Sequence, residues 1–302
     1  TPGRAQDLVN QHKLHLDAVQ ITALDEADQM ADMGFLPQVR KLLRLTPARG
    51  QRLLFSATLD GDVNKLVEQF LHDPVVHSTA PVRAAVDSMS HHLFFVGDRP
   101  ARNEVVLRIA ARQGKTIMFM RTKHGVDRQV KKLRRAGINA YPLHGDKGQG
   151  ARTHAIEGFA DGSVPVLVAT DIAARGIDIA DVSLVVHVDP PAEHKAYLHR
   201  AGRTARGGAA GTVVTLVMDE QRKEVATLIN KAGVMATEHD ISKRDNPAGA
   251  PALKEVTGAR KPNGPALPPP GQAATQKPKN AAKSSNSQRR RPSAKAARRR
   301  HH

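Results

Sequence analysis

Short apolar runs alternate with amphipathic stretches along the first 235 residues of the chain. The apolar runs predict strands, several of them rich in β-branched residues, and apolar positions three and four residues apart predict helices between them. The predicted strands cover residues 18–24, 52–55, 92–96, 116–120, 140–143, 164–169, 184–188 and 212–217. The predicted helices cover residues 35–45, 62–71, 103–113, 126–136, 152–159, 194–200 and 221–232. Because strands and helices alternate, we expect an α/β fold in which helices cover both faces of a parallel sheet.

The same pattern divides the chain into four segments. Residues 1–75 hold an incomplete α/β unit, residues 76–91 a linker, and residues 92–235 a second, more regular unit. Residues 236–302 form a tail, in which the pattern stops beyond Asp245 and Pro, Ala, Lys, Ser and Asn dominate. This composition predicts a disordered, basic tail.

The positive charge of the chain is concentrated in that tail. The net charge is +17, and residues 245–302 contribute 13 basic against 2 acidic residues. Such a tail favours a polyanionic partner, and nucleic acid is favoured over an anionic membrane because few large apolar residues interleave the charges. Trp is absent and Tyr occurs twice, so we expect phosphate contacts rather than base stacking to dominate binding.

Cysteine usage and hydropathy narrow the class of protein further. The chain contains no cysteine, which excludes disulfides and thiolate metal sites and fits a reducing, cytoplasmic location. It has no apolar run of about 18 residues and opens on no signal peptide, so we expect no membrane contact. The chain begins with Thr1 rather than Met, and we expect a processed or truncated end there.

Two polar motifs follow strands of the first unit. Asp25-Glu26-Ala27-Asp28 comes directly after the strand predicted at 18–24, and ligands of parallel sheets bind at such strand ends. One acid there can hold Mg²⁺ through water beside nucleotide phosphates, and the next can deprotonate an attacking water. An acidic helix N-terminus explains the same residues equally well. Ser56-Ala57-Thr58 follows the next strand and, taken alone, is typical of a helix N-cap.

A basic motif occupies residues 199–206, with the sequence His-Arg-Ala-Gly-Arg-Thr-Ala-Arg. Arg203 and Arg206 are spaced so that two guanidinium groups can reach one site, as arginine fingers do in phosphoryl transfer. A solvated basic loop is the alternative interpretation of this segment.

Residues 168–178 combine a strand end with polar and glycine residues. Thr170 and the backbone of Gly176 can bind a nucleic-acid phosphate, and Asp178 can accept a hydrogen bond from a ribose hydroxyl. A glycine turn capped by an aspartate is the alternative, and it explains some of these residues but not all.

Taken together, these motifs resemble the DEAD-box family of superfamily 2 helicases. The resemblance covers residues 1–235 in the family's order, with two departures, Ala201 in place of a branched apolar residue and Ala205 in place of Gly. It implies two RecA-like domains, the first incomplete and the second complete, that bind ATP and Mg²⁺. The matching segments are Thr1-Pro2-Gly3-Arg4, Asp25–Asp28, Ser56–Thr58, Ile117–Lys123, His144-Gly145-Asp146 with Gln149 and Arg152, residues 169–178 and residues 199–206.

The resemblance also implies roles for individual residues. Asp25 would coordinate Mg²⁺ through water, and Glu26 would be the base for ATP hydrolysis. The other implied catalytic and coupling residues are Asp28, Ser56, Thr58, His199, Arg200, Arg203 and Arg206. Gly176 and Asp178 would contact ATP together with Arg203 and Arg206. The implied RNA contacts are Thr1, Gly3, Arg4, Arg121, Thr122, Gln149, Arg152, Thr170, Arg175 and Gly176.

The function that the resemblance implies is an ATP-dependent RNA helicase. It would unwind or remodel short RNA duplexes or ribonucleoproteins through sequence-independent contacts with the RNA backbone. Ribonucleoprotein, RNA-decay or ribosome-assembly proteins are candidate partners. The alternative is a non-catalytic RNA-binding module, made of the second unit and the tail, whose binding would depend on salt and not on ATP.

The printed sequence lacks the family's P-loop, Gly-x4-Gly-Lys-Ser/Thr. Gly114-Lys115-Thr116 looks similar, but Ile109 stands where the first Gly is required, and a helix precedes the tripeptide while a strand follows. We therefore interpret it as the start of a strand. We expect that the front of the first domain is missing, that the chain alone hydrolyses no ATP at a meaningful rate, and that residues 1–75 expose apolar sheet surface.

Overall fold

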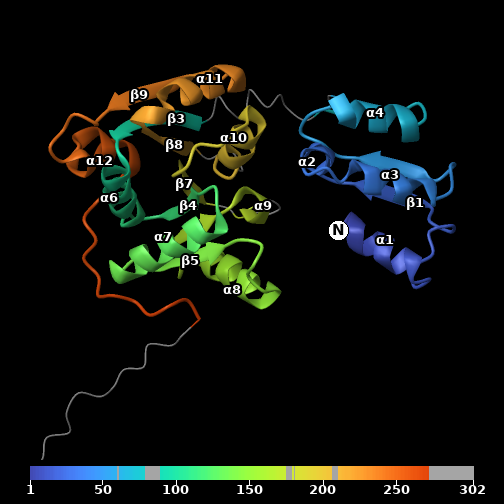
Figure 1. The fold of residues 1–302 in the computed structure, drawn as a ribbon, viewed down its shortest axis with the longest axis horizontal. Coiled ribbons are helices and arrows are strands. Elements are labelled where there is room, and N and C mark those ends of the chain that lie inside the picture. The colour runs from blue at the N-terminus through green and yellow to red at the C-terminus, as the bar shows by residue number, and fades with distance from the viewer. Residues whose placement is uncertain (60, 79–88, 175–178, 180, 206–209, 272–302) are drawn as a thin grey trace, which may run out of the picture.

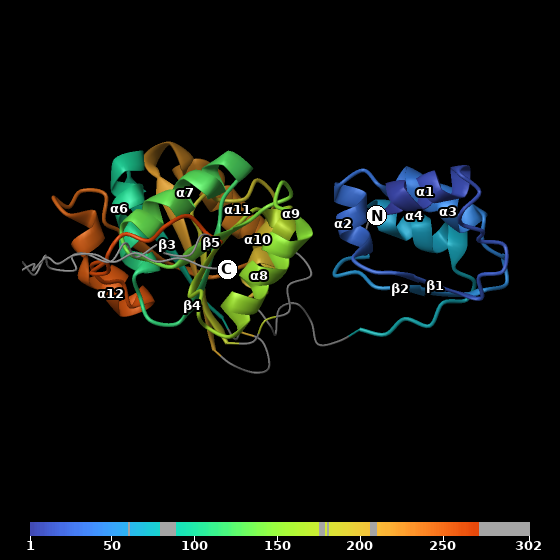
Figure 2. The same cartoon turned by 90° about the horizontal axis from the view of Figure 1, so that it is seen from below.

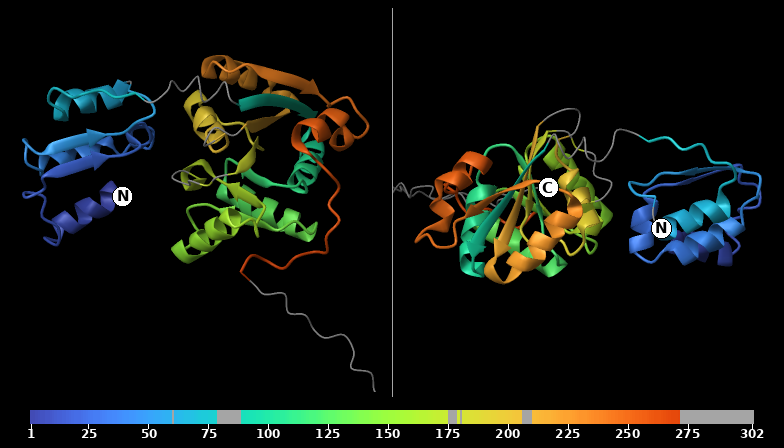
Figure 3. Two further views of the ribbon diagram at one scale, coloured as in Figure 1. Left: turned by 180° about the vertical axis from the view of Figure 1, so that it is seen from behind. Right: turned by 90° about the horizontal axis from the view of Figure 1, so that it is seen from above.

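The computed structural model describes residues 1–59, 61–78, 89–174, 179, 181–205 and 210–271. Within these residues the strands form two separate parallel sheets, one of two strands and one of seven. Figure 1 shows the two units, and Figure 3 shows them from two further directions. The predicted α/β class with parallel strands is confirmed. No helix in the described part of the chain is long and apolar enough to cross a membrane.

The first unit is built on β1 (Ile21–Leu24) and β2 (Gln51–Leu54), which run parallel with Ile21 opposite Gln51. The helices of this unit lie on one side of the strand pair (Figure 2). There, Leu24 and Leu54 pack against a small buried cluster that contains Leu66. The helices are α1 (Pro2–Asn10), α2 (Ala27–Asp32), α3 (Leu36–Arg44) and α4 (Gly61–Phe70).

The opposite face of β1 and β2 carries exposed apolar side chains. Successive residues of a strand point to opposite faces, so Ile21 and Leu53 point away from the helices that cover Leu24 and Leu54. Ile21 is 60% exposed, Leu53 is 38% exposed, and Phe55, just beyond β2, is 54% exposed. The expectation that residues 1–75 expose apolar sheet surface is therefore confirmed for the described residues.

The second unit contains a seven-stranded parallel sheet in the order β5-β6-β4-β7-β8-β3-β9. Because all strands are parallel, their carboxyl ends lie along one edge, and the segments that carry Arg121, Thr122 and Thr170 leave from that edge. The strands are β3 (Met89–Gly97), β4 (Lys115–Phe119), β5 (Ala140–Leu143), β6 (Val166–Ala169), β7 (Val182–His187), β8 (Gly211–Met218) and β9 (Ala236–Asp240). The helices are α6 (Arg99–Ala110), α7 (Lys123–Arg135), α8 (Gln149–Ala160), α9 (Asp171–Ala174), α10 (His194–Ala201), α11 (Arg222–Ala232) and α12 (Pro251–Thr257).

Helices cover both faces of this sheet, as predicted. Along β4, Ile117 and Phe119 belong to a core that also contains Tyr197 of α10. Met118, between them, belongs to the other core with Leu133 of α7. All five side chains are between 0 and 2% exposed. Successive residues of β4 face opposite cores, and both cores are apolar. The strand is therefore a continuous apolar run in the sequence.

The predicted start of the tail at residue 236 is wrong. Residues 236–240 form β9, which pairs with β3 at the edge of the sheet, and α12 buries Leu253 completely. The sequence of β9 is Ala-Thr-Glu-His-Asp, which lacks the apolar run of a buried strand. Polar residues are tolerated there because β9 is an edge strand that is paired on one side only. Residues 272–302, which carry most of the basic residues of the tail, lie outside the described residues.

After α12 the chain runs back across the second unit toward the end of α7 (Figures 2 and 3). We call residues 258–271 the C-terminal strap. The amide of Leu267 donates to the Arg134 carbonyl at 2.8 Å, at the end of α7. Gly264 lies so close to Gly137 that a Cβ on Gly137 would be 2.3 Å from the Gly264 carbonyl oxygen. The strap is therefore packed against the second unit rather than hanging from it.

Candidate functional site

The acidic motif begins where β1 ends. The Glu26 amide donates to the Asp25 carboxylate at 2.9 Å, and Glu26 has a φ of 51°, in the left-handed region, where the chain turns into α2. The Ala27 amide donates to the Phe55 carbonyl at 3.1 Å. This bond fixes the acidic motif to the end of β2, where the Ser-Ala-Thr motif begins. The predicted site residues of these two motifs therefore lie together at one edge of the small sheet.

Asp28 joins these two motifs directly. The side chain is buried, its backbone amide donates to Ser56 Oγ at 3.2 Å, and the Thr58 hydroxyl donates to its carboxylate at 3.5 Å. The Gln29 amide donates to the other carboxylate oxygen at 3.0 Å. Asp28 is therefore held by both hydroxyl residues of the Ser-Ala-Thr motif.

A histidine of the second unit approaches the same carboxylate. His199, in α10, places its Nε2 3.6 Å from Asp28 Oδ2. Burial raises the pKa of Asp28, but interactions with His199, Gln29 and Ser56 outweigh burial and lower that pKa to about 2. Asp28 is therefore ionised at neutral pH and presents a negative charge to the second unit.

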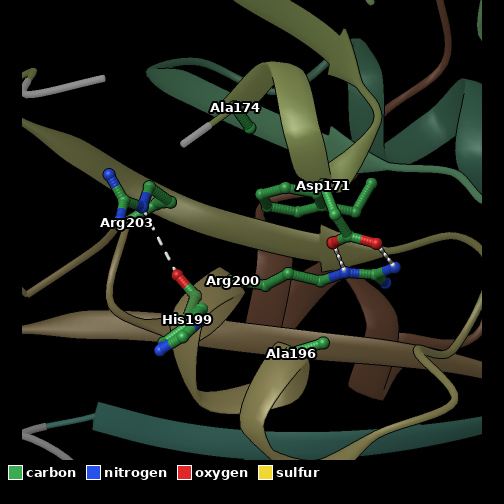
Figure 4. Close-up of a pocket in the computed structure, with 7 residues that line it drawn as sticks. Asp171, Ala174, Ala196, His199, Arg200 and Arg203 are labelled. Carbon is green, nitrogen blue, oxygen red and sulfur yellow. Dashed lines mark hydrogen bonds and ion pairs between the residues drawn. The ribbon is translucent and has the colours of Figure 1, made fainter. Parts of the chain in front are cut away.

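The acidic and basic motifs line one cavity of about 300 Å³ between the two units. Asp25, Glu26 and Asp28 line it from the first unit, and His199 and Arg203 line it from the second. Arg203 Nε donates to the His199 carbonyl oxygen at 3.3 Å, as Figure 4 shows. Carboxylates that face an arginine can bind a cation and an anion side by side, the arrangement that a metal–phosphate complex requires.

Arg200 is held differently from its neighbour Arg203. Its guanidinium donates to both carboxylate oxygens of Asp171 (Figure 4), and its Nη1 donates to the Asp189 carbonyl at 2.8 Å. The same group lies over the ring of Phe119, 5.1 Å from its centroid. Because Arg200 is buried and bonds within its own unit, we interpret it as the residue that holds α10 against the ends of β6 and β7.

The predicted RNA contacts of the second unit lie at the carboxyl ends of three neighbouring strands, β4, β6 and β5. Arg121 and Thr122 follow β4 and are exposed, and Thr122 also caps the N-terminus of α7. Thr170 follows β6 directly, and Gln149 and Arg152 lie in the first turn of α8, after β5. Adjacent polar and cationic groups along a strand edge are suited to binding the phosphates of an extended nucleic-acid strand.

The remaining predicted site residues either lie at the start of α1 or fall outside the described residues. Thr1, Gly3 and Arg4 are exposed at the start of α1 in the first unit, and Arg4 pairs with Asp7. Four predicted residues lie outside the described residues, namely Arg175, Gly176, Asp178 and Arg206.

Asp189 connects three parts of the site and was not selected from the sequence. Its Oδ1 accepts from Arg102 Nη1 at 2.8 Å, its Oδ2 accepts from the Arg121 amide at 3.0 Å, and its carbonyl accepts from Arg200. The residue therefore ties the end of β7 to α6, to the end of β4 and to α10. The available signal was an acid followed by two prolines at the end of an apolar strand, the same position as the other motifs.

The His-Gly-Asp segment after β5 is also fixed by a charged cluster. His144 is buried, with its Nε2 3.1 Å from Asp127 Oδ1, and Lys147 Nζ lies 2.9 Å from the same oxygen. Burial raises the pKa of Asp127, but its bonds with Lys147 and His144 outweigh burial and lower it. This cluster attaches the loop that precedes Gln149 to α7.

Gly114-Lys115-Thr116 is the start of a strand, as predicted. Lys115 and Thr116 are the first residues of β4. Lys115 Nζ donates to the Ala160 carbonyl at 2.8 Å, so the ammonium group is bound at the end of α8. The tripeptide therefore does not form a phosphate-binding loop.

The surroundings of Asp25 suit Mg²⁺ better than they suit a metal ion that takes all its ligands from protein side chains. Within the described residues, no group of three or more His, Cys, Asp or Glu side chains could hold a metal ion by itself. Mg²⁺ usually keeps several waters and is bound through one or two carboxylates together with nucleotide phosphates. An exposed carboxylate at a strand end, facing a cavity lined by an arginine, matches that requirement.

The parallel sheets, with acidic and arginine motifs facing one cavity, define a RecA-like helicase fold. Residues 1–66 match the family described as DEAD/DEAH box helicase, and residues 101–208 match the Helicase conserved C-terminal domain. The chain belongs to the DEAD-box family of superfamily 2 helicases.

Named relatives and solved structures agree with this family. The ATP-dependent RNA helicase RhlB of Pseudomonas syringae pv. tomato is 38% identical over 237 residues, which cover 77% of this chain and 59% of that protein. RhlB of Pseudomonas aeruginosa is 40% identical over 223 residues, which cover 73% of this chain and 56% of that protein. The structure of S. cerevisiae Dbp5 bound to RNA and ADP BeF3 is similar with a TM-score of 0.73 and 28% identity, over 85% of this chain and 68% of that chain. The chain thus spans somewhat under three fifths of either RhlB protein.

Proposed function

We propose that the two units form opposite sides of the working cleft of a DEAD-box ATP-dependent RNA helicase. The enzyme would unwind or remodel short RNA duplexes or ribonucleoproteins as it hydrolyses ATP. The observation that carries the proposal is the cavity in which Asp25 and Glu26 of one unit face Arg203 of the other. Phosphoryl transfer needs a positioned water on one side and cationic charge around the transferred group. Each unit supplies one of these, so hydrolysis requires both units to close together.

The proposed roles of the cleft residues follow from their positions. Asp25 would hold Mg²⁺ through water, and the ion would supply positive charge at the nucleotide phosphates. Glu26 accepts the proton of the attacking water. Arg203 stabilises negative charge on the transferred phosphoryl group, an effect of order 10³–10⁵ in rate. The remaining proposed nucleotide contacts are Gly176, Asp178 and Arg206.

Coupling between nucleotide and RNA is proposed to run through Asp28. Its carboxylate accepts from Thr58 in the first unit and lies next to His199 in the second. Opening of the cleft separates Asp28 from His199, so the attraction between the carboxylate and the imidazole is lost. The contact therefore favours the closed arrangement in which the acids face Arg203.

RNA is proposed to bind along the strand ends that carry Arg121, Gln149, Arg152 and Thr170. Contacts from these side chains go to phosphates and sugars, so binding does not depend on base sequence. The similar Dbp5 structure contains RNA and ADP BeF3, which supports a polynucleotide and a nucleotide as the ligands of this fold. The exposed Thr1, Gly3 and Arg4 are the proposed contacts of the first unit.

The test separates this function from a passive RNA-binding module. We propose that the 302-residue chain alone releases no phosphate from ATP at a meaningful rate, because the printed sequence has no P-loop. A fusion that places a DEAD-box P-loop segment ahead of Thr1 should release phosphate in an RNA-stimulated manner. Glu26→Gln in the same fusion should abolish release and leave RNA binding intact.

Two outcomes would contradict the proposal. Robust RNA-stimulated ATP hydrolysis by the unfused chain would show that hydrolysis does not need a P-loop. An RNA affinity of the fusion that does not respond to ATP would favour the non-catalytic RNA-binding module.

A further inference from the structure

A second cavity, of about 290 Å³, opens between the N-terminal ends of α6 and α7. We call it the α6–α7 pocket, and Figures 1 and 2 show the two helices as neighbours on one face of the sheet. Its lining also includes residues at the ends of β4 and β8. Five of its lining residues are cationic, namely Arg99, Arg102, Arg121, Arg128 and Lys132.

The charges in the α6–α7 pocket do not balance. Among the described residues that line it, Asp189 supplies the single carboxylate, and it already accepts from Arg102 Nη1 and from the Arg121 amide. Within the described part of the chain, the other basic side chains of α6 and α7 that line the pocket form no ion pair. A concave surface with such an excess of one charge concentrates ions of the opposite charge. The pocket is therefore suited to an anion.

Two buried donors at the wall of the pocket lack an acceptor. The Arg102 side chain is 9% exposed, and its Nε has no hydrogen-bond partner among the described residues. Gln129 is 3% exposed, and its Nε2 also lacks a partner there. Buried donors are nearly always paired in folded proteins. Both residues line the pocket, so an oxyanion bound there would lie next to these side chains.

The backbone at the pocket points to the same ligand. Arg99 is the first residue of α6, and Thr122 is the N-cap of α7, so both helices begin at the pocket. The first amides of a helix have no acceptor within the helix, and the positive end of its dipole lies there. The side chains of Asp98 and Thr122 each satisfy one of these amides. Helix starts of this kind bind phosphate and similar oxyanions.

We propose that the α6–α7 pocket binds a phosphate group. Two sources share this chemistry: the backbone of an RNA strand that continues past Arg121, or a free phosphorylated small molecule. Arg121 lines the pocket and also belongs to the proposed RNA surface, so an RNA strand could reach the pocket without a break. The RNA source rests on the proposed function, whereas the free molecule does not.

The first arm of the test measures RNA binding by the full 302-residue chain. The pocket variant is Arg128→Glu with Lys132→Glu, and the control variant is Lys131→Glu with Arg135→Glu. All four residues are exposed on α7 and the charge change is the same, but only the first pair lines the pocket. A fluorescein-labelled oligouridylate of about ten nucleotides is titrated at several salt concentrations. If RNA occupies the pocket, loss of two phosphate contacts lowers the salt slope by about 1.4 relative to the control variant.

The second arm uses inorganic pyrophosphate alone. It should raise the thermal unfolding midpoint of the unmodified chain and of the control variant, and should have no effect on the pocket variant. A response in this arm without a difference in RNA salt slope assigns the pocket to a free phosphorylated molecule. Equal behaviour of the pocket and control variants in both arms would overturn the proposal. If the unmodified chain and both variants all fail to bind RNA, the proposed function is refuted. The pyrophosphate arm would still show whether the pocket binds phosphate.

Discussion

Asp28 and His199 meet between the two units, with the histidine Nε2 3.6 Å from the aspartate Oδ2. The same carboxylate accepts a hydrogen bond from Thr58, and the Asp28 amide donates to Ser56. One buried residue therefore contacts the Ser-Ala-Thr motif of its own unit and the basic motif of the other. A displacement of either motif changes the bonds available to the other, which is the physical basis of the coupling that we propose.

Acid should weaken this contact in a defined pH window. The pKa of Asp28 is lowered from 3.8 to about 2, so its ionised form contributes stability above pH 4 that is lost as the pH falls toward 2. Asp28→Asn should cost about 1 kcal/mol of unfolding free energy at pH 7, because the carboxylate is partly screened at the cleft, and almost nothing at pH 2. Urea unfolding followed by circular dichroism at pH 7, 4 and 2 measures the difference. Asp32→Asn, an exposed change on the same helix, is the control, and a cost for Asp28→Asn that is equal at all three pH values would contradict the assignment.

Arg200 and Arg203 should separate into a structural and a catalytic residue. Arg200→Met removes a buried guanidinium and leaves Asp171 and the Asp189 carbonyl without their partner, so it should destabilise the chain by about 3 kcal/mol. Arg203→Met should change stability by less than about 0.5 kcal/mol but should abolish phosphate release by the P-loop fusion. Thermal unfolding and phosphate release, measured on both variants, test the distinction. Similar stability losses for the two variants would show that Arg200 has no special structural role.

The sequence predicted most of the second unit because its strands are buried on both faces. β6, Val-Leu-Val-Ala, is a continuous apolar run, and its end predicted the position of Thr170 correctly at the sheet edge. The polar edge strand β9 and the four-residue helix α9 carry no such periodic signal, and both were missed. A short polar segment gains its structure from its neighbours, so local pattern cannot identify it.

The sequence motifs predicted candidate site residues one by one, but not how they are arranged in space. The acidic motif, the Ser-Ala-Thr motif and Thr170 follow strand ends, where parallel sheets bind ligands, whereas the basic motif begins inside α10. The approach of His199 to Asp28 depends on how the two units sit together, which local sequence does not encode. Asp189 was missed because its importance lies in the three groups that it joins, and these come from distant parts of the chain.

The C-terminal strap should contribute measurably to the stability of the second unit. Gly137 has a φ of +80°, and an added Cβ would clash with the Gly264 backbone. Gly162 has a similar φ of +84° but open space around its Cα, so it isolates the cost of backbone strain. Gly162→Ala should destabilise by about 1 kcal/mol and Gly137→Ala by about 3 kcal/mol, because the second change also displaces the strap. Urea unfolding of both variants measures the difference, and equal costs would mean that the strap moves away freely.

Two truncations should separate the structural and electrostatic parts of the C-terminal segment. A chain that ends at Gly271 keeps α12 and the strap but loses 10 basic residues and no acidic ones. It should fold normally, and the salt dependence of its RNA affinity should be flatter than that of the full chain, because fewer counterions are released on binding. A chain that ends at Arg244 also loses the fully buried Leu253, so it should be destabilised by at least about 2 kcal/mol. Filter binding at several salt concentrations and thermal unfolding measure the two effects. An unchanged salt slope after truncation at Gly271 would show that the tail has no part in RNA binding, whereas normal stability after truncation at Arg244 would show that α12 is dispensable.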